Sequence, residues 1–438
     1  MKLMKLLKVD TIEQAGKKIL DHIKSWPKKT ETVSLDDAPG RILAHDVYAE
    51  CEIPSFRRST VDGYAVKAKD TAGAAEGIPV FFKLAGSVQM GKEAGFSIAG
   101  GNGEAESLCA YVPTGGMIPE GADAVVMIEY CEAAQLKQCA QLKQCTGDII
   151  SVYEAVAPGT GIAEIGEDFQ KGKLLLENGA FINPQEIGAF CAAGVTHINV
   201  YSQLTVSIFS TGDELTAPRC VPAPGQVRDI NTNLLKALAL KNGFSVISAD
   251  VLPDDETRIE NAVREASALC DIVIISGGSS QGDKDFTGRI IDRIAKPGVF
   301  THGLALKPGK PAIFGWDEEN KTLFAGLPGH PVSAMMVFNL LLSPLSLQLS
   351  SLYSDSRHPA FRASYPVTAR ISCNVPGSPG RTTCLPVALK QENGITLAEP
   401  VFGKAGMIST LTRADGYIKI DLNKEGLKKD EQVFVYLL

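Results

Sequence analysis

The sequence predicts a multidomain α/β protein in which a doubly wound, mostly parallel sheet accompanies β-rich domains and a small C-terminal β-barrel. Three observations predict this class. The length of 438 residues corresponds to about three domains. Short buried strand patterns alternate with helical patterns from residue 183 to about residue 350, as in doubly wound sheets. The regions on either side carry short strand patterns separated by glycines, which favour β-rich domains.

The composition excludes several classes of protein. Hydrophobic residues make up 45% of the chain and charged residues 21%, which is typical of soluble globular proteins and not of disordered ones. A net charge of −7 makes nucleic acid or an anionic membrane a poor partner. The ten cysteines form no C-x-x-C motif, so we expect reduced thiols and a cytoplasmic protein. The chain contains no uninterrupted apolar stretch of the roughly 18 residues that a membrane span needs.

Residues 10–26 predict one amphipathic helix, with Asp10 and Glu13 spaced as a capping box and Pro27 after its end. From residue 28 to about residue 182 the pattern is β-rich. Its short strand-type runs are residues 41–47, 80–84, 124–128 and 172–176. The pentapeptide QLKQC occurs twice, at 135–139 and 141–145. So short a tandem cannot be a repeat unit, and we expect a loop or hairpin-tip insertion.

The alternating region begins with Asn183 as an N-cap and Pro184 at the first helical position of a helix that Gly194 ends. Its expected strands are residues 204–209, 244–251, 271–275 and 312–314. Its expected helices are residues 233–241, 255–269 and 286–295. After a polar linker at 351–358, strand patterns return at 367–371, 416–420 and 432–436 without a convincing helix. This predicts a small C-terminal barrel or sandwich.

The loops that follow the predicted strands carry the candidate chemistry, because ligands of doubly wound sheets bind at the carboxyl ends of the strands. Carboxylates occur in STGDEL, RDINTN and SGGSSQGDKDF, namely at Asp213, Glu214, Asp229, Asp283 and Asp285. Glycines and hydroxyls suited to phosphate occur at Gly277, Gly278, Ser279, Gly282 and Gly329. Two lysines, Lys307 and Lys310, occur in KPGKP.

The carboxylates, glycines and lysines of these loops predict more together than any one of them does alone. A glycine alone is also what a turn contains, and an aspartate alone is also what a helix cap contains. Acidic and basic residues beside phosphate-type loops fit a magnesium ion that bridges to a phosphorylated ligand. The chain has no Walker A lysine and no G-x-G-x-x-G before a helix, which disfavours ordinary nucleotide hydrolases and nicotinamide enzymes.

The β-rich half has candidates of its own. The segment PSFRRSTVDGYAV contains Ser59 and Asp62, TGG contains Thr114, and GED contains Asp168. His330 has no second metal-ligand partner at a suitable spacing, so we expect a cap or packing residue there.

Taken together, PSFRRSTVDGYA, TGGMIPEGADAV, GED, FSTGDEL, RDINTN, SGGSSQGDKDF, KPGKP and GLPGHPVSA resemble the molybdopterin molybdenumtransferase family. The C-terminal domain of gephyrin is the animal relative of this family. The ordered matches cover roughly residues 10–350, and each motif alone is weak.

The resemblance implies an elongated homodimer of four-domain subunits. The implied domains are a discontinuous linker domain, a DGYA-containing β-rich domain, a molybdopterin-binding α/β domain and a β-barrel, at residues 27–52 with 149–182, 53–148, 10–26 with 183–353, and 356–438. The implied reaction is the last step of molybdenum cofactor synthesis, in which molybdate enters adenylylated molybdopterin and AMP is released with magnesium present. The pathway's adenylyltransferase and acceptor molybdoenzymes are further implied partners.

The resemblance also assigns roles to residues. Catalytic roles fall on Asp62, Thr114, Glu214 and Asp285, and magnesium on Glu214, Asp229 and Asp285. The resemblance and the loop chemistry assign ligand binding to Ser59, Asp168, Gly277, Gly278, Ser279, Gly282, Lys307, Lys310, Gly329 and Arg381. Lys307, Lys310 and Arg381 match the family's oxyanion-binding cations, and the site is therefore expected between two domains.

Three segments depart from the family's pattern. Arginines usual before GED are replaced by Ala163, Glu164 and Ile165, a usual asparagine by His330, and a usual basic residue by Gly303. The choice between molybdate and tungstate therefore stays open. Two other functions also stay open: adenylyl transfer to molybdopterin, which SGGSSQGD resembles too, and a non-catalytic cofactor-binding scaffold.

Overall fold

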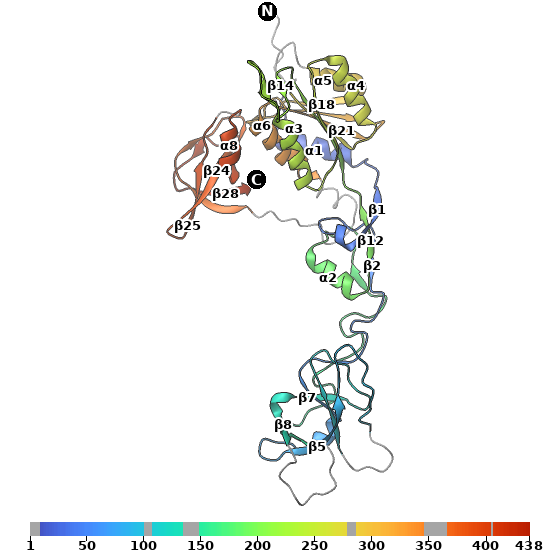
Figure 1. Ribbon diagram of the computed structural model, residues 1–438. Helices are drawn as coiled ribbons and strands as arrows, with labels where there is room; N and C mark the ends of the chain where they lie inside the picture. Colours follow the sequence, from blue (N-terminus) through green and yellow to red (C-terminus); the bar gives the residue numbers. More distant parts are fainter. Residues whose placement is uncertain (1–8, 100–106, 135–148, 278–285, 346–365, 404–405) are drawn as a thin grey trace, which may run out of the picture. The chain divides into compact units, whose positions relative to one another are not determined.

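The computed structural model describes residues 9–99, 107–134, 149–277, 286–345, 366–403 and 406–438 (Figure 1). They form two compact units. The first unit comprises Met1–His45, Glu177–Asn183 and Ile198–Leu438, and the second comprises Asp46–Leu176 and Pro184–His197. The QLKQC repeats and the expected linker at 351–358 lie outside the described residues.

The first unit contains the predicted doubly wound sheet, with strands in the order β16-β13-β17-β21-β20-β18. Its parallel members are β13 (Thr205–Thr211), β16 (Ser245–Leu252), β17 (Ile272–Ser276) and β21 (Thr322–Leu327). At one edge, β20 (Ile313–Asp317) runs antiparallel to β21, and β18 (Pro297–His302) runs antiparallel to β20. The mostly parallel sheet is therefore confirmed, whereas the sequence pattern did not predict β18 and β21.

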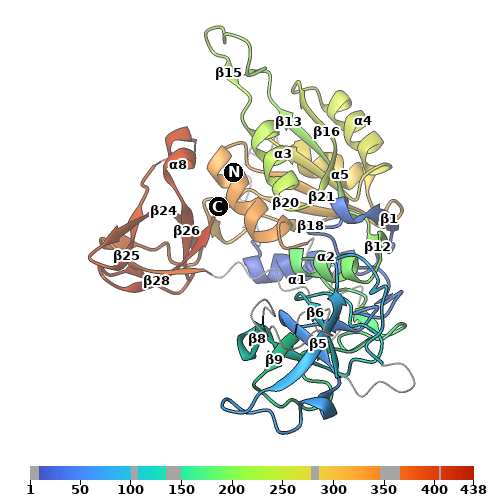
Figure 2. The ribbon, with the colours of Figure 1, turned by 60° about the horizontal axis from the view of Figure 1, so that its bottom comes forward.

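Helices cover both faces of this sheet, as Figure 2 shows. One core contains residues of α1 (Ile12–Ile23), α3 (Asn231–Lys241) and α6 (Pro331–Val337), and the other contains residues of α4 (Glu256–Ser267) and α5 (Phe286–Ile294). Along β17, Ile272 and Ile274 face the first core and Val273 and Ile275 face the second. Burial on both faces explains why this strand is a continuous apolar run.

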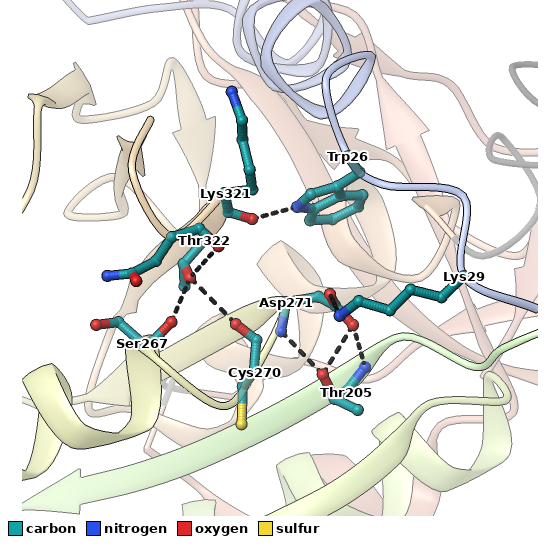
Figure 3. A network of polar contacts seen from close by, with 9 residues as sticks. Trp26, Lys29, Thr205, Ser267, Cys270, Asp271, Lys321 and Thr322 are labelled. Atoms are coloured by element: carbon teal, nitrogen blue, oxygen red, sulfur yellow. Dashed lines mark hydrogen bonds and ion pairs between the residues drawn. The ribbon is translucent and has the colours of Figure 1, made fainter.

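The amino ends of the strands are tied together by polar contacts (Figure 3). Asp271 accepts hydrogen bonds from the Thr205 amide at 2.8 Å and hydroxyl at 2.7 Å, and pairs with Lys29 at 3.0 Å. Thr322 donates to the carbonyl oxygens of Ser267 and Cys270. Because protein contacts engage these polar groups at the amino ends, we look for a ligand site at the opposite, carboxyl ends of the strands.

The N-terminal helix begins differently from the expectation. Thr11, and not Asp10, is the N-cap of α1, and it forms the capping box with Gln14. Asp10 instead accepts a hydrogen bond from Thr301 at 2.7 Å and pairs with Lys18 at 2.6 Å. The expected box was wrong because tertiary contacts with β18 engage the Asp10 carboxylate.

The C-terminal region of the first unit is the predicted β-barrel. Its strands are β22 (Val367–Ile371), β24 (Thr382–Glu392), β25 (Ile395–Pro400), β26 (Gly416–Ile420) and β28 (Gln432–Leu437). The barrel closes because β24 pairs with both β25 and β26. β19 (Leu306–Lys307), from the α/β part, joins β24 in parallel. The region also contains α8 (Ile408–Arg413), so the expectation of no helix was wrong; six residues are too few to show helical periodicity.

The second unit is β-rich, as predicted. Its six-stranded sheet comprises β7 (Ala124–Met127), β4 (Gly63–Val66), β6 (Leu108–Val112), β5 (Val80–Ser87), β9 (Ile149–Val152) and β8 (Cys131–Ala134), in that spatial order. Two short ribbons pair β10 (Ile162–Ala163) with β3 (Arg58–Ser59) and β11 (Leu174–Leu176) with β2 (Val47–Tyr48). The predicted helix after Asn183 is α2 (Pro184–Ala192).

Shorter elements complete the described chain. They are β1 (Thr30–Ser34) with β12 (His197–Tyr201), β14 (Leu215–Thr216) with β15 (Val227–Arg228), β23 (Val375–Pro376) with β27 (Gly426–Leu427), 3₁₀ turns Leu35–Asp37, Ala68–Thr71 and Ile128–Tyr130, and a π-helical turn Phe338–Leu342. The strand expected at 41–47 is reduced to isolated bridges at Ile42 and Leu43 before β2. Within the described ranges, the structure contains no helix long and apolar enough to span a membrane.

Candidate functional site

Five residues at or beside the carboxyl ends of β13, β17 and β21 form a group that we call the strand-end cradle. They are Thr211, Asn231, Ser276, Gly277 and Gly329. The strand ends are level, because Ser276 pairs with Ser210 on one side and with Leu327 on the other. Each of these strands thus delivers its following loop to the same edge of the sheet.

Gly277 is required at its position. Its φ of +114° lies in the region that favours glycine, and a Cβ there would be 2.6 Å from the Thr211 carbonyl oxygen. Gly329 is different, since a Cβ on this residue would meet only the Cα of Gly277 at 3.8 Å. The backbone of the cradle is therefore close-packed at Gly277 and open at Gly329.

Asn231, at the start of α3, connects the two glycine loops. Its side-chain amide donates to the Ser276 hydroxyl at 2.8 Å and to the Gly329 carbonyl at 2.8 Å. Within the described part of the chain, its own Oδ1 is buried without a hydrogen-bond partner, and so is the hydroxyl oxygen of Thr211. The cradle thus holds two buried oxygen atoms that the described residues leave without a hydrogen bond.

Two predicted metal ligands, Glu214 and Asp229, lie between β13 and α3 in the sequence and differ in their exposure to solvent. Asp229 is only 5% exposed, and its carboxylate accepts from the Thr232 amide at the start of α3. Glu214 is exposed, and its carboxylate folds back over Gly212. Among the residues that the structure describes, His, Cys, Asp and Glu side chains form no cluster of three that could hold a metal. Gly278, Ser279, Gly282, Asp283 and Asp285 lie outside those residues.

The predicted basic residues Lys307 and Arg381 come together where β19 meets β24. The Lys307 ammonium donates to the Ser378 hydroxyl at 3.0 Å, and the Arg381 amide donates to the Ser378 carbonyl at 2.9 Å. Lys307 pairs in register with Thr383, two residues after Arg381. The register therefore places Lys307 beside Thr383, and Arg381 in the turn that leads into β24. The Thr383 hydroxyl is buried and has no partner among the described residues.

Lys310 follows the turn after Lys307. Its carbonyl accepts from the Leu304 amide at 2.8 Å, and its side chain is half-buried. His330, the N-cap of α6, makes no side-chain capping bond, and its ring packs against Gly406, where a Cβ would lie 3.2 Å from the ring. His330 is exposed, and its expected role as a cap or packing residue stays a prediction.

In the second unit, Ser59, Asp62 and Thr114 lie together. The Asp62 carboxylate accepts from the Thr114 amide at 2.7 Å. The buried Ser59 hydroxyl bonds to the Val61 backbone, and the Ser59 carbonyl accepts from the Gly115 amide at 2.8 Å. Ser59 thus holds the turn that presents the exposed Asp62 and Thr114.

Asp168 occupies another loop of the second unit, where its amide donates to the Ile53 carbonyl at 3.0 Å. Glu164, at one of the positions that depart from the family's arginines, pairs with Arg57 at 3.1 Å. The loop before Asp168 therefore supplies a carboxylate that pairs with Arg57, where the family's arginines would add positive charge.

No local sequence signal marks Thr211, Asn231, Ser276 or Thr383 as a site residue. Thr211, Asn231 and Ser276 lie inside the motifs, but as neutral residues they resemble ordinary strand-end and helix-start residues. Burial without a partner, which marks the oxygens of Thr211, Asn231 and Thr383, is not visible in a sequence.

The fold places the chain in the doubly wound α/β class, whose ligands bind at the carboxyl ends of the strands. Three family models match in order: the MoeA N-terminal region (domain I and II) at residues 10–194, a probable molybdopterin binding domain at 207–348, and the MoeA C-terminal region (domain IV) at 368–438. The chain belongs to the MoeA family, whose curated members are transferases of molybdenum cofactor biosynthesis.

Relatives resemble the chain over most of its length. A molybdopterin molybdenumtransferase of Haemophilus influenzae is 35% identical over 81% of this chain and 81% of its own length. The enzyme of the same name from Bacillus subtilis is 29% identical over 94% of this chain and 90% of its own length. The crystal structure of the molybdopterin biosynthesis MoeA protein from Pyrococcus horikoshii has a TM-score of 0.75 at 31% identity, and covers 98% of this chain and 99% of that one.

Proposed function

We propose that this chain inserts molybdenum into adenylylated molybdopterin and releases AMP. The observation that carries the proposal is the full-length likeness to enzymes named molybdopterin molybdenumtransferase. The strand-end cradle adds physical support, because level strand ends followed by glycine loops suit a phosphorylated ligand. Four domains are proposed. Residues 53–148 form the β-rich domain, and residues 10–26 with 183–353 form the molybdopterin-binding domain. Residues 27–52 with 149–182 form the linker domain, and residues 356–438 form the β-barrel.

Magnesium fits the carboxylate oxygens that Asp229 and Glu214 place beside the cradle. Glu214 and Asp229 would hold it together with Asp285. The bound ion would neutralise negative charge on the phosphate groups of the ligand. Asp229 serves a second purpose, since its carboxylate also caps the first turn of α3. Its two roles are compatible, because a carboxylate has several lone pairs.

The oxyanion is proposed to bind at Lys307 and Arg381, with Lys310 as a further cation. Directed cationic donors are what a dianion such as molybdate or tungstate needs. The shared hydrogen-bond partner of Lys307 and Arg381, Ser378, supports this assignment because it holds both basic residues to one turn. In the second unit, Asp62 and Thr114 are proposed as catalytic, with Ser59 as their support and Asp168 as a further ligand residue.

A homodimer, a cytoplasmic location and contact with the pathway's adenylyltransferase and acceptor molybdoenzymes are also proposed, on the likeness to the family.

The experiment that tests the function incubates the chain with adenylylated molybdopterin, magnesium and molybdate, and measures AMP together with reconstitution of an apo-molybdoenzyme. We expect molybdate-dependent AMP release and active cofactor. If ATP and molybdopterin instead give adenylylated molybdopterin, the chain is an adenylyltransferase. If neither reaction occurs and the pterin still binds, the chain is a scaffold.

A further inference from the structure

We propose that Thr211 Oγ1 and Asn231 Oδ1 bind a hydrogen-bond donor of the ligand in the strand-end cradle, an inference that rests on the proposed function. Both residues are 7% exposed, and neither oxygen has a hydrogen-bond partner among the residues that the structure describes. Buried polar atoms in native proteins are almost always paired, so an unpaired one needs an explanation. Two of them at the ligand edge of one sheet favour a bound ligand as the partner.

The orientation of the Asn231 amide is determined by its neighbours. The Gly329 carbonyl can only accept, so the nitrogen of the Asn231 side chain must face it. The oxygen is therefore the free end of the amide, and an amide oxygen can only accept. Whatever completes this site must offer an O–H or N–H group.

Thr211 lies at the end of β13, against Gly277, where a Cβ would be 2.7 Å from the Thr211 hydroxyl oxygen. Because glycine lacks a Cβ, its peptide can turn aside with little steric resistance when a ligand enters. The Thr211 hydroxyl can accept from the ligand donor or donate to an adjacent ligand oxygen. The close packing of Gly277 thus explains how this oxygen is shielded before binding.

The donor chemistry has two sources in an adenylylated pterin. The nucleotide offers ribose hydroxyls and an exocyclic amine, and the pterin offers ring N–H and amine groups. Both satisfy the acceptor, so measurements with AMP and with adenylylated molybdopterin separate them.

The decisive variant is Thr211→Val, which replaces the unpaired hydroxyl by a methyl group of equal shape. No protein hydrogen bond is lost, so we expect an unchanged or higher thermal midpoint. We also expect about fivefold weaker binding of adenylylated molybdopterin, the value of one ordinary hydrogen bond. Weaker AMP binding to the same extent assigns the donor to the nucleotide, and unchanged AMP binding assigns it to the pterin.

Thr322→Val is the matched control, because the Thr322 hydroxyl is equally buried but has partners at 2.7 Å and 3.1 Å at the amino end of β21. It should lower the thermal midpoint and leave ligand affinity unchanged. Asn231→Ala should weaken binding more than Thr211→Val, since it also removes the ties to Ser276 and Gly329.

Unchanged affinity of Thr211→Val for both ligands, with the wild-type protein binding them, would overturn the inference and leave the proposed function standing. Failure of the wild-type protein to bind either ligand would instead overturn the proposed function.

Discussion

The two ends of the parallel strands differ in how their buried polar groups are paired. At the amino end, Thr205, Asp271 and Thr322 each take part in at least two hydrogen bonds (Figure 3). At the carboxyl end, Thr211 and Asn231 each keep a buried oxygen without a partner. Paired groups stabilise the fold, whereas unpaired ones cost stability and gain their bonds only from a ligand. The difference in hydrogen bonding therefore separates residues that stabilise the sheet from residues that we expect to bind the ligand.

Asp271→Ala should have the largest effect, and it acts on the amino end. The change leaves the half-buried Thr205 amide and hydroxyl without their acceptor and removes the ion-pair partner of Lys29. We expect a loss of about 3 kcal/mol in the free energy of unfolding, measured by urea denaturation. Asp255→Ala, which removes the exposed cap of α4, should cost about 1 kcal/mol and serves as the control. An equal cost for both variants would contradict the structural role of the amino end.

Gly277→Ala tests the carboxyl end. The added Cβ would strike the Thr211 carbonyl and displace the cradle, so we expect AMP release to fall roughly hundredfold. Gly329→Ala adds the same atom in open space and should retain much more activity. Similar losses in the two variants, with thermal midpoints recorded for both, would argue against a close-packed cradle.

Arg381→Ala and Lys307→Ala address the cationic site near the barrel. Loss of one charge-assisted contact should cost roughly 1.5 to 3 kcal/mol, and so raise the molybdate requirement for AMP release tenfold to hundredfold. Affinity for adenylylated molybdopterin should change little. Lys390→Ala, which breaks an exposed ion pair with Glu399 on the barrel, is the control. An unaltered molybdate dependence in Arg381→Ala, Lys307→Ala and Lys310→Ala together would remove this assignment.

The smallest effect concerns His22, in the last turn of α1, whose ring lies 4.7 Å from the ring of Phe300 and 5.4 Å from that of Trp316. Burial lowers the pKa of His22 below its ordinary value, although Glu318 and Asp21 oppose the shift. The unfolded chain therefore binds this proton first, and stability is lost as the pH falls below about 6.5 toward the lower folded pKa. His22→Phe should flatten the decline of the thermal midpoint between pH 7 and pH 5. A parallel decline in both proteins would show that other groups cause it.

Local patterns in the sequence predicted much of the fold and part of the site. The apolar run of β17 predicted a strand buried on both faces, and the following Gly277 occupies a position that only glycine suits. The combined motifs led to the family, whereas the catalytic assignment of Asp62 and Thr114, which are joined by a hydrogen bond, stays a prediction. Such features are visible in sequence because burial and positive φ restrict residue type at single positions.

Other features depend on residues far apart in the chain, and only the tertiary structure decided them. Thr11 caps α1 in place of Asp10, because Thr301, 291 residues away, donates a hydrogen bond to the Asp10 carboxylate. The Asn231 amide is oriented by Gly329, and Lys307 joins Arg381 through Ser378 and the register of β19 with β24. Which polar atoms find partners is set by strand register and packing, and these have no local signal in composition or periodicity. Sequence patterns therefore predicted most of the elements, the family and the charged candidates, whereas the tertiary structure determined which neutral oxygens remain unpaired among the described residues, because pairing requires the positions of both partners.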